Sequence, residues 1–211
     1  RCLLAKKIDE VYVATDSNEI KEVVEKHGGK VIMTSCNHQT GTDRIAEAAA
    51  GLNAEIIVNV QGDEALVKPE HIDKVVAELY DNPDVNVGIL VNPYSKRNNP
   101  SDIKTVLTQD NDVMYFSRAD IPSDARVSEP PMLKAYHIIP FRKTFLLEYA
   151  RWEEGELECI EFIEFMRILE RGHKIRAVLV ESDAVSVDTA EDLEFVRGKM
   201  LKDPFFPLYK T

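Results

Sequence analysis

The 211-residue sequence predicts an α/β protein in which a three-layer arrangement places a mostly parallel sheet between helices on both faces. Strand-like and helix-like segments alternate along most of the chain, a pattern typical of parallel strands joined by helical crossovers. The run "EIIVNVQ" at 55–61 is apolar without alternation, as expected of a strand covered on both faces. With this length and 44% hydrophobic residues, we expect a single domain over residues 1–211.

The segments before this run form two strand–helix pairs. Residues 11–15 ("VYVAT") predict a strand, and apolar residues at helical spacing predict a helix over 20–27 that two glycines end. Residues 30–35 ("KVIMTS") predict the next strand. The stretch "TGTDRIAEAAAG" at 40–51 then predicts a turn that leads into an Ala-rich helix.

The segments after it continue the alternation and then depart from it. A helix is predicted over 68–80, with a proline in its first turn, and a buried strand over 85–91. Two strand-like runs within 103–117 flank "DND" at 110–112, which predicts a hairpin. The stretch "LKAYHIIPFR" at 133–142 predicts one further strand.

The last third predicts a long helix and a final strand–helix unit. Residues 156–171 have a helical pattern that is apolar on two sides, which favours burial of the second side against a partner chain. Residues 174–188 predict a strand region, and residues 189–200 predict the helix that follows it.

The composition argues against several classes of protein. A formal net charge of -11 disfavours nonspecific binding of nucleic acid, which depends on Lys and Arg at the phosphates. No run of about 18 apolar residues is present, so we expect no insertion into a membrane. Three scattered cysteines predict neither a disulfide framework nor a zinc site, and they favour a reducing, cytoplasmic compartment.

Two carboxylates follow predicted strands and are the first candidates for chemistry. In sheets of this kind ligands bind beyond the carboxyl ends of the strands, where Asp63 and Asp188 are expected. Mg²⁺ takes few protein ligands and leaves positions for water and substrate phosphates, so the two residues form a candidate magnesium pair. The alternative is that each aspartate only caps the helix after it. Gly62 favours the first interpretation, because it lets the backbone approach a ligand beside the carboxylate.

Several other polar residues have both a functional and an ordinary interpretation. The turn Thr40–Arg44 suits an anion or polar ligand group at a helix amino end, although an ordinary N-cap at Thr42 explains it equally well. Arg118 follows a strand and offers a forked guanidinium to a carboxylate or phosphate, or is a surface residue. Two further sets line a pocket or are simply solvated: Lys134, His137 and Arg142 on one predicted strand, and Glu158, Glu161 and Glu164 along the long helix.

Several stretches taken together resemble one family. These are "VYVATDSNEI", "HQTGTDRIAEA", "VNVQGDE", "YFSRADIP" and "VDTAEDLE", with an "LE..E..E..R.LE.G" pattern between them. They are similar to the bacterial 3-deoxy-manno-octulosonate (Kdo) cytidylyltransferases from Arg1 to about Met200. The resemblance implies a nucleotide-diphospho-sugar transferase fold with a small dimerisation insert. It also implies a homodimer that activates Kdo with CTP, dependent on Mg²⁺, for lipopolysaccharide synthesis.

The resemblance also implies roles for particular residues. The implied catalytic residues are Asp63, Asp188 and Arg118, of which the two aspartates also bind the metal and Arg118 also binds the sugar acid. Residues 104–171 are expected to include the lobe for sugar binding and dimerisation. The implied cytidine-binding residues are Thr42, Asp43, Arg44 and Gln61, and the implied substrate-binding residues are Arg118, Lys134, His137, Glu161 and Glu164.

Two departures from the family lie at the implied sugar pocket. The family pattern Lys-His-Ile-Gly-Leu-Tyr is replaced by "KAYHII" at 134–139, which removes one His and places another two positions later. The pattern Glu-Gln-Leu-Arg becomes "EFMR" at 164–167. We therefore expect a modified eight-carbon 2-keto acid as substrate, such as the 8-amino analogue of Kdo.

A third departure is that nothing corresponds to the family's Arg-rich and Gly-rich phosphate loop. About 40 further residues at the amino end are needed to supply the strand, loop and helix around it. The sequence begins without Met, and we expect residues to be missing upstream. Two alternatives stay open: a synthetase of another CMP-sugar, such as a sialic-acid type, and a catalytically silent nucleotide-binding dimer.

Overall fold

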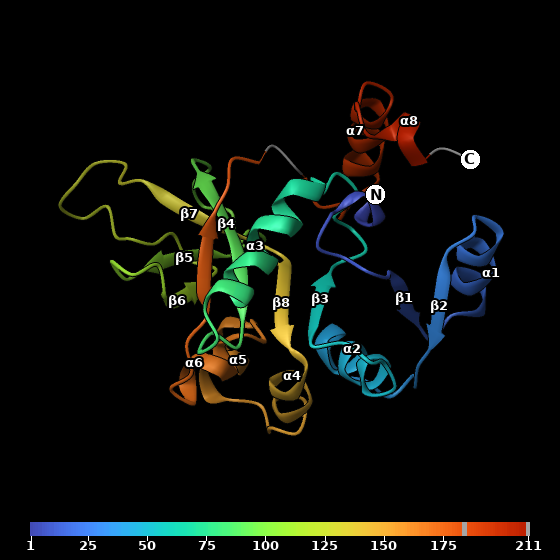
Figure 1. The fold of residues 1–211 in the computed structure, drawn as a ribbon. Coiled ribbons are helices and arrows are strands. Elements are labelled where there is room, and N and C mark those ends of the chain that lie inside the picture. Colours follow the sequence, from blue (N-terminus) through green and yellow to red (C-terminus); the bar gives the residue numbers. More distant parts are fainter. Residues whose placement is uncertain (183–184, 210–211) are drawn as a thin grey trace.

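The computed structural model describes residues 1–182 and 185–209 and has an α/β fold, as predicted (Figure 1). Helices and strands alternate from the amino end until the hairpin in the middle of the chain. In order, the elements are η1 (Cys2–Leu4), β1 (Tyr12–Thr15), α1 (Asn18–Lys26), β2 (Lys30–Met33), α2 (Gly41–Ala50), β3 (Ile56–Val60), α3 (Pro69–Asp81), β4 (Gly88–Tyr94), β5 (Lys104–Leu107), β6 (Val113–Ser117), β7 (Met132–Tyr136), β8 (Ile138–Arg142), α4 (Lys143–Tyr149), α5 (Glu156–Glu161), α6 (Met166–Glu170), β9 (Arg176–Leu179), α7 (Ala190–Met200) and α8 (Phe206–Tyr209).

The strands form three hydrogen-bonded groups. The largest has the order β6-β5-β7-β4-β9, and β3 pairs with β8 while β1 pairs with β2. The β1–β2 and β4–β9 pairings are parallel, and the other pairings are antiparallel. The sheet is therefore less parallel than the alternation of elements predicted, because the hairpin β5–β6 and the returning strands β7 and β8 run against their neighbours.

Helix α3 lies in the middle of the molecule and packs against β4, β8 and β9 (Figure 1). Its apolar stripe is fully buried, as the helical spacing predicted, with Ile72, Val75 and Leu79 at 0% exposure. A Cβ at Gly88 would lie 3.1 Å from side-chain atoms of Leu79 and Pro140, so the helix and the strand approach closely at this glycine, and a larger residue would force its neighbours to shift. This packing fixes the strands whose ends carry the site.

The long helix predicted over 156–171 is wrong in one respect, because it is broken in two. Helix α5 ends where Phe162 adopts a left-handed backbone with φ 57°, and α6 starts only at Met166. The break is stabilised from outside, since the side chain of Arg118 donates to the carbonyl oxygens of Glu161 and Phe162, each at 2.9 Å. Phe162 is left 82% exposed.

The single strand predicted over 133–142 is also wrong, because it is two strands in different sheets. Strand β7 pairs with β4, and β8 pairs with β3, with a bend at His137 between them. Arg142 consequently does not share a strand face with Lys134. Its guanidinium donates to the carbonyl oxygens of Leu79 and Val85 and pairs with Glu55.

The remaining predictions concern the hairpin, the last strand, the cysteines and a membrane span. The hairpin formed, with β5 and β6 antiparallel and Asn111 at φ 62° in the turn. The last strand region is shorter than predicted, since β9 covers only Arg176–Leu179, and positions 183–184 lie outside the described residues. The three cysteines are free. Among the helices that the structure describes, none has both the length and the apolar character needed to cross a membrane.

Candidate functional site

A cavity of about 910 Å³ opens beyond the ends of β3, β6 and β7. Its volume is in the range of small-molecule binding sites, which are commonly about 300–1,000 Å³. Loops after the strands supply most of its polar lining, as expected of an α/β sheet. It brings together eight of the residues named individually from the sequence: Gln61, Asp63, Arg118, Lys134, His137, Glu158, Glu164 and Asp188.

Asp63 and Asp188 meet at this cavity although 124 positions separate them in the sequence (188 − 63 − 1). The backbone N–H of Val187 donates to the carbonyl oxygen of Asp63 at 3.1 Å, which places the two segments side by side. Burial and the negative charge of Asp188 raise the pKa of the Asp63 carboxyl, opposed in part by its own backbone N–H. Two carboxylates held this close favour a cation between them.

The alternative of simple helix caps is not supported. Helix α7 is capped by Thr189, whose hydroxyl accepts from the N–H of Asp192, so the carboxylate of Asp188 is not the cap. No helix starts directly behind Asp63, because α3 begins at Pro69. Both aspartates therefore remain available to a ligand.

Glu64 holds the two carboxylate segments together from behind. Its side chain is 4% exposed and accepts a hydrogen bond from the Ser186 hydroxyl at 2.7 Å. Burial, together with the charges of Asp63 and Asp188, raises the pKa of the Glu64 carboxyl. The sequence analysis missed this contact, because Ser186 carries no motif that points to Glu64.

The residues present fit a divalent cation. Oδ1 of Asp63 is buried and has no hydrogen-bond partner among the described residues, which is the state of an oxygen that awaits a ligand. Three or more His, Cys, Asp or Glu side chains do not converge as a metal cage within the described ranges. Mg²⁺ needs no such cage, because one or two carboxylates with substrate phosphates and water suffice.

The turn before α2 lines the cavity, but not with Thr42, Asp43 and Arg44, the residues that the resemblance implied. The N-cap is Thr40 rather than Thr42, and Thr40 and Gly41 line the cavity. Asp43 faces a separate hollow of about 430 Å³, and Arg44 pairs with Asp16 at 3.2 Å.

Thr42 is buried in a short hydrogen-bonded chain that connects this turn to the rest of the site. The amide of Asn59 donates to the Thr42 hydroxyl at 3.4 Å, and that hydroxyl donates to Oε1 of Glu164 at 2.9 Å. Burial raises the pKa of the Glu164 carboxyl, and its Oε2 has no partner among the described residues. Glu164 is therefore fixed by the turn before α2, and its other oxygen has no partner among the described residues.

The three glutamates of the broken helix have three different environments. Glu158 is 6% exposed and forms a two-point ion pair with Arg167, so the solvated face that the spacing favoured is wrong for this residue. Glu161 accepts from Ser117 Oγ at 3.0 Å and from the backbone N–H of Arg118 at 3.0 Å, and does not line the cavity. Glu158 and Glu164 both line it.

Arg118 lies on the wall of the cavity with part of its guanidinium already engaged. Three of its five N–H groups donate to carbonyl oxygens, those of Pro100, Glu161 and Phe162, each at 2.9 Å. One N–H on each terminal nitrogen is left. This geometry presents two donors of a rigid fork, which suits a carboxylate.

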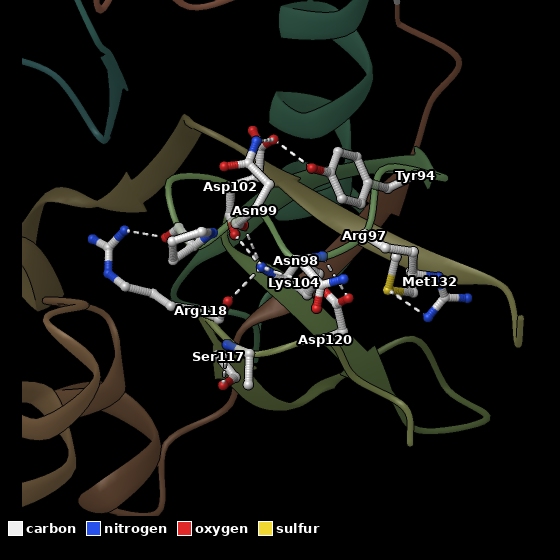
Figure 2. Close-up of polar contacts among 12 residues, drawn as sticks. Tyr94, Arg97, Asn98, Asn99, Asp102, Lys104, Ser117, Arg118, Asp120 and Met132 are labelled. Carbon is white, nitrogen blue, oxygen red and sulfur yellow. Dashed lines mark hydrogen bonds and ion pairs between the residues drawn. The ribbon is translucent and has the colours of Figure 1, made fainter. Parts of the chain in front are cut away.

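Lys134 shares this wall with an aspartate that the sequence analysis did not single out. Its ammonium pairs with Asp102, whose Oδ2 also accepts from the Tyr94 hydroxyl at 2.5 Å and the Asn99 amide at 2.7 Å (Figure 2). Asp102 thus lowers the net charge at this end of the cavity. Nothing local in the sequence indicates these contacts, which arise from loops brought together by the fold.

His137 occupies the bend between β7 and β8 and lines the cavity half-buried. Burial lowers the pKa of the imidazole from 6.5 to about 4, and the positive charges of Lys134 and Arg118 act in the same direction. The negative charge of Asp102 opposes this effect. The ring is therefore neutral near pH 7. A neutral imidazole donates and accepts hydrogen bonds without adding to the charge of the site.

The depressed pKa of His137 gives an expected pH dependence of stability. The unfolded chain binds the proton below about pH 6.5 and the folded chain only near pH 4, so this contribution is complete above 6.5 and is lost as the pH falls toward 4. Some solvent contact of the ring limits it to about 1–3 kcal/mol. Urea unfolding of His137→Gln between pH 7.5 and 4.5 should show a flatter fall than the unmodified protein, whereas the exposed His27→Gln should not. Equal slopes in all three proteins contradict the assignment.

The fold and this cavity, with paired carboxylates and a cationic wall, define a nucleotidyltransferase of the α/β class. The chain belongs to the cytidylyltransferase family, whose model matches residues 1–175. Among its relatives, the 3-deoxy-manno-octulosonate cytidylyltransferase of Geobacter sulfurreducens is 38% identical over 95% of this chain and 86% of its own length. The 8-amino-3,8-dideoxy-manno-octulosonate cytidylyltransferase of Shewanella piezotolerans is 34% identical over 96% and 86%. A solved CMP:2-keto-3-deoxy-manno-octonic acid synthetase complexed with CTP superposes with a TM-score of 0.91, at 33% identity over 95% of this chain and 84% of that one.

Proposed function

We propose that the protein transfers CMP from CTP to an eight-carbon 2-keto sugar acid, Kdo or its 8-amino analogue, and releases pyrophosphate for lipopolysaccharide synthesis. The observation that carries the proposal is the single cavity that joins Asp63 and Asp188 at one end to Arg118 and Lys134 at the other. The relatives named for both acids and the synthetase structure named with CTP support it.

In the proposed reaction the anomeric hydroxyl of the sugar acid attacks the α-phosphorus of CTP. A new oxygen–phosphorus bond forms, the bond to the bridging oxygen of the β-phosphate breaks, and the hydroxyl gives up its proton. Negative charge gathers on the phosphoryl oxygens, so positioning and electrostatic stabilisation provide most of the rate. Gln61, Thr40 and Gly41 line the end of the cavity that we assign to the nucleotide.

We propose Asp63 and Asp188 as the residues that hold Mg²⁺. When bound, the ion supplies positive charge at the phosphates and lowers the pKa of the attacking hydroxyl. The unpartnered Oδ1 of Asp63 and the raised pKa of its carboxyl support this assignment. A cation would give the oxygen a partner and would stabilise the charged form of the carboxyl. Glu64 and Ser186 keep the two aspartate segments in place.

The sugar acid is assigned to the other end of the cavity. The two free N–H groups of Arg118 are oriented by its contacts with Pro100 and the end of α5, and suit the carboxylate of the acid. Glu164 lies between the two ends, because it follows Phe162, whose carbonyl oxygen binds Arg118, while its own carboxylate accepts from Thr42 in the turn before α2. It lines the cavity with an oxygen that has no partner among the described residues. An ammonium group on the substrate would pair with it, which favours the 8-amino acid.

We further propose a cytoplasmic homodimer, with residues 104–171 forming the lobe for sugar binding and dimerisation. The exposure of Ile160 (69%) and Phe162 (82%) at the end of α5 supports an apolar contact with a second copy. The three free cysteines support a reducing compartment.

Pyrophosphate release with CTP and a panel of acids tests the function. We expect turnover with Mg²⁺ and an eight-carbon 2-keto acid, no turnover with a nine-carbon sialic acid, and a higher kcat/KM for 8-amino-Kdo than for Kdo. Glu164→Gln should reduce that preference, since it removes the charge that pairs with the ammonium. Equal or better turnover of Kdo by the unmodified protein removes the 8-amino assignment, and turnover of sialic acid alone removes the function.

A further inference from the structure

Lys104 is a buried, charged residue that has no part in the proposed reaction. It lies at the start of β5, beside the cavity but not in its lining, and its exposure is 0%. Lysine is rarely buried so completely unless its ammonium is paired. The groups around its ammonium must therefore compensate for the burial of the charge.

Among the described residues, the ammonium of Lys104 donates hydrogen bonds to three backbone carbonyl oxygens and to no other group (Figure 2). The distances are 2.8 Å to Asn99, 2.7 Å to Asp102 and 2.6 Å to Arg118. The nearest carboxylate oxygen, on Asp120, is 3.8 Å away. All three protons of the ammonium are thus used, and the hydrogen bonds run to main chain rather than to an ion-pair partner.

These three carbonyls belong to the two segments that form the cationic wall of the cavity. The loop 99–103 carries Asp102, which holds Lys134, and Pro100, whose carbonyl oxygen accepts from Arg118 at 2.9 Å. The second segment carries Arg118 itself. One ammonium therefore joins the backbone of Arg118 to the loop on which its side chain rests.

An apolar residue does not replace this arrangement. Three partly buried carbonyl oxygens that converge on one point repel one another, and each needs a hydrogen-bond donor. A single ammonium supplies three donors and a positive charge at their meeting point. Burial lowers the pKa of Lys104, while the nearby carboxylates of Asp120 and Asp102 oppose that effect.

We propose that Lys104 is a positioning residue for recognition of the acid substrate: by holding three main-chain carbonyls it sets the position of Arg118 against loop 99–103. The proposal rests on the proposed function for the identity of that substrate. Lys104 does not touch the nucleotide end of the cavity, so its effect is confined to the sugar acid.

The test compares Lys104→Met with a matched control, Lys143→Met. Lys143 also donates to two backbone carbonyls, those of Ala50 and Leu52, but lies away from the cavity. We expect Lys104→Met to raise the KM for the sugar acid about 10- to 100-fold and to change the KM for CTP less than about 3-fold, because a shift of about 1 Å in a positioning group has effects of that size. Lys143→Met should leave both constants unchanged.

A merely structural role predicts something different. Both variants then lose thermal stability, and the folded fraction of Lys104→Met keeps the original KM for the acid; that result overturns the proposal. Should Lys104→Met not fold, Lys104→Gln retains an N–H donor and is judged by the same pair of KM values.

Amide hydrogen exchange separates this proposal from the proposed function. If the unmodified protein has no activity with any acid, the function fails, yet Lys104 can still be assessed. Faster exchange of the amides at 99, 101–103 and 118–120 in the Lys104 variant, but not in Lys143→Met, supports the role of Lys104 in fixing the wall. Unchanged exchange there overturns it.

Discussion

Asp63→Ala is expected to lower kcat for pyrophosphate release by about 10³-fold or more while the protein stays folded. Asp63 provides one of the two carboxylates at the nucleotide end, and Asp188 alone leaves the phosphates with half of that binding site. The loss should appear in kcat rather than in the KM for the sugar acid, because the acid is assigned to the opposite wall.

The same substitution should not destabilise the fold. Oδ1 of Asp63 is buried without a partner among the described residues, and the charge of Asp188 raises the pKa of the Asp63 carboxyl. Replacing the carboxylate removes the buried oxygen without a partner and the repulsion from Asp188. The urea midpoint in the absence of Mg²⁺ should therefore be equal or higher.

The control for Asp63→Ala is Asp84→Ala, which removes an exposed carboxylate outside the cavity. It should retain kcat. Addition of Mg²⁺ should raise the melting temperature of the unmodified protein and of the Asp84 variant, but not that of Asp63→Ala. Turnover by Asp63→Ala within about 3-fold of the unmodified protein would exclude Asp63 from the site.

The meeting of Asp63 and Asp188 could be predicted in part, from one general rule. Parallel strands carry their carboxyl ends to one edge, so residues directly after two strands converge whatever their separation in the sequence. The rule needs only the strand positions, which the unbroken apolar run before Asp63 made plain. It applies directly to Asp63, which follows β3, but not to Asp188, because β9 ends at Leu179, nine positions earlier. The segment of Asp188 reaches Asp63 through the backbone N–H of Val187, a contact that the rule does not predict.

The opposite wall of the cavity could not be predicted, because its contacts are tertiary. The apolar spacing continues through residues 156–170 without Gly or Pro, so nothing in the sequence marks the left-handed Phe162. The break depends on Arg118, 44 positions earlier, which binds the carbonyls that the helix end leaves unpaired. Lys104 and Asp102 are similar, since their partners come from different loops.

The second large effect is expected in stability, from the ion pair that joins the two halves of the broken helix. Arg167→Met should lower the free energy of unfolding by about 3–5 kcal/mol, because it leaves the charge of Glu158 buried without its partner. Glu158 and Arg167 have only 7% and 4% of their side chains exposed. They are joined by two hydrogen bonds of 2.6 Å each. The guanidinium also donates to the carbonyl oxygen of Trp152 at 2.9 Å and lies 5.1 Å from the centre of the Tyr149 ring.

The two helices that this ion pair joins are short, so they depend on contacts with each other. Helices α5 and α6 have 6 and 5 residues, too few to be stable alone, so contacts between them must hold the segment that carries Glu164. Urea unfolding of Arg167→Met, Glu158→Gln and the double variant measures the coupling, and the double variant should lose less than the sum of the single losses. Arg197→Met breaks an exposed pair with Glu194 and should cost about 1 kcal/mol or less. A loss as small as that in Arg167→Met would mean that the pair does not hold the two helices together, and the position of Glu164 would then need another cause.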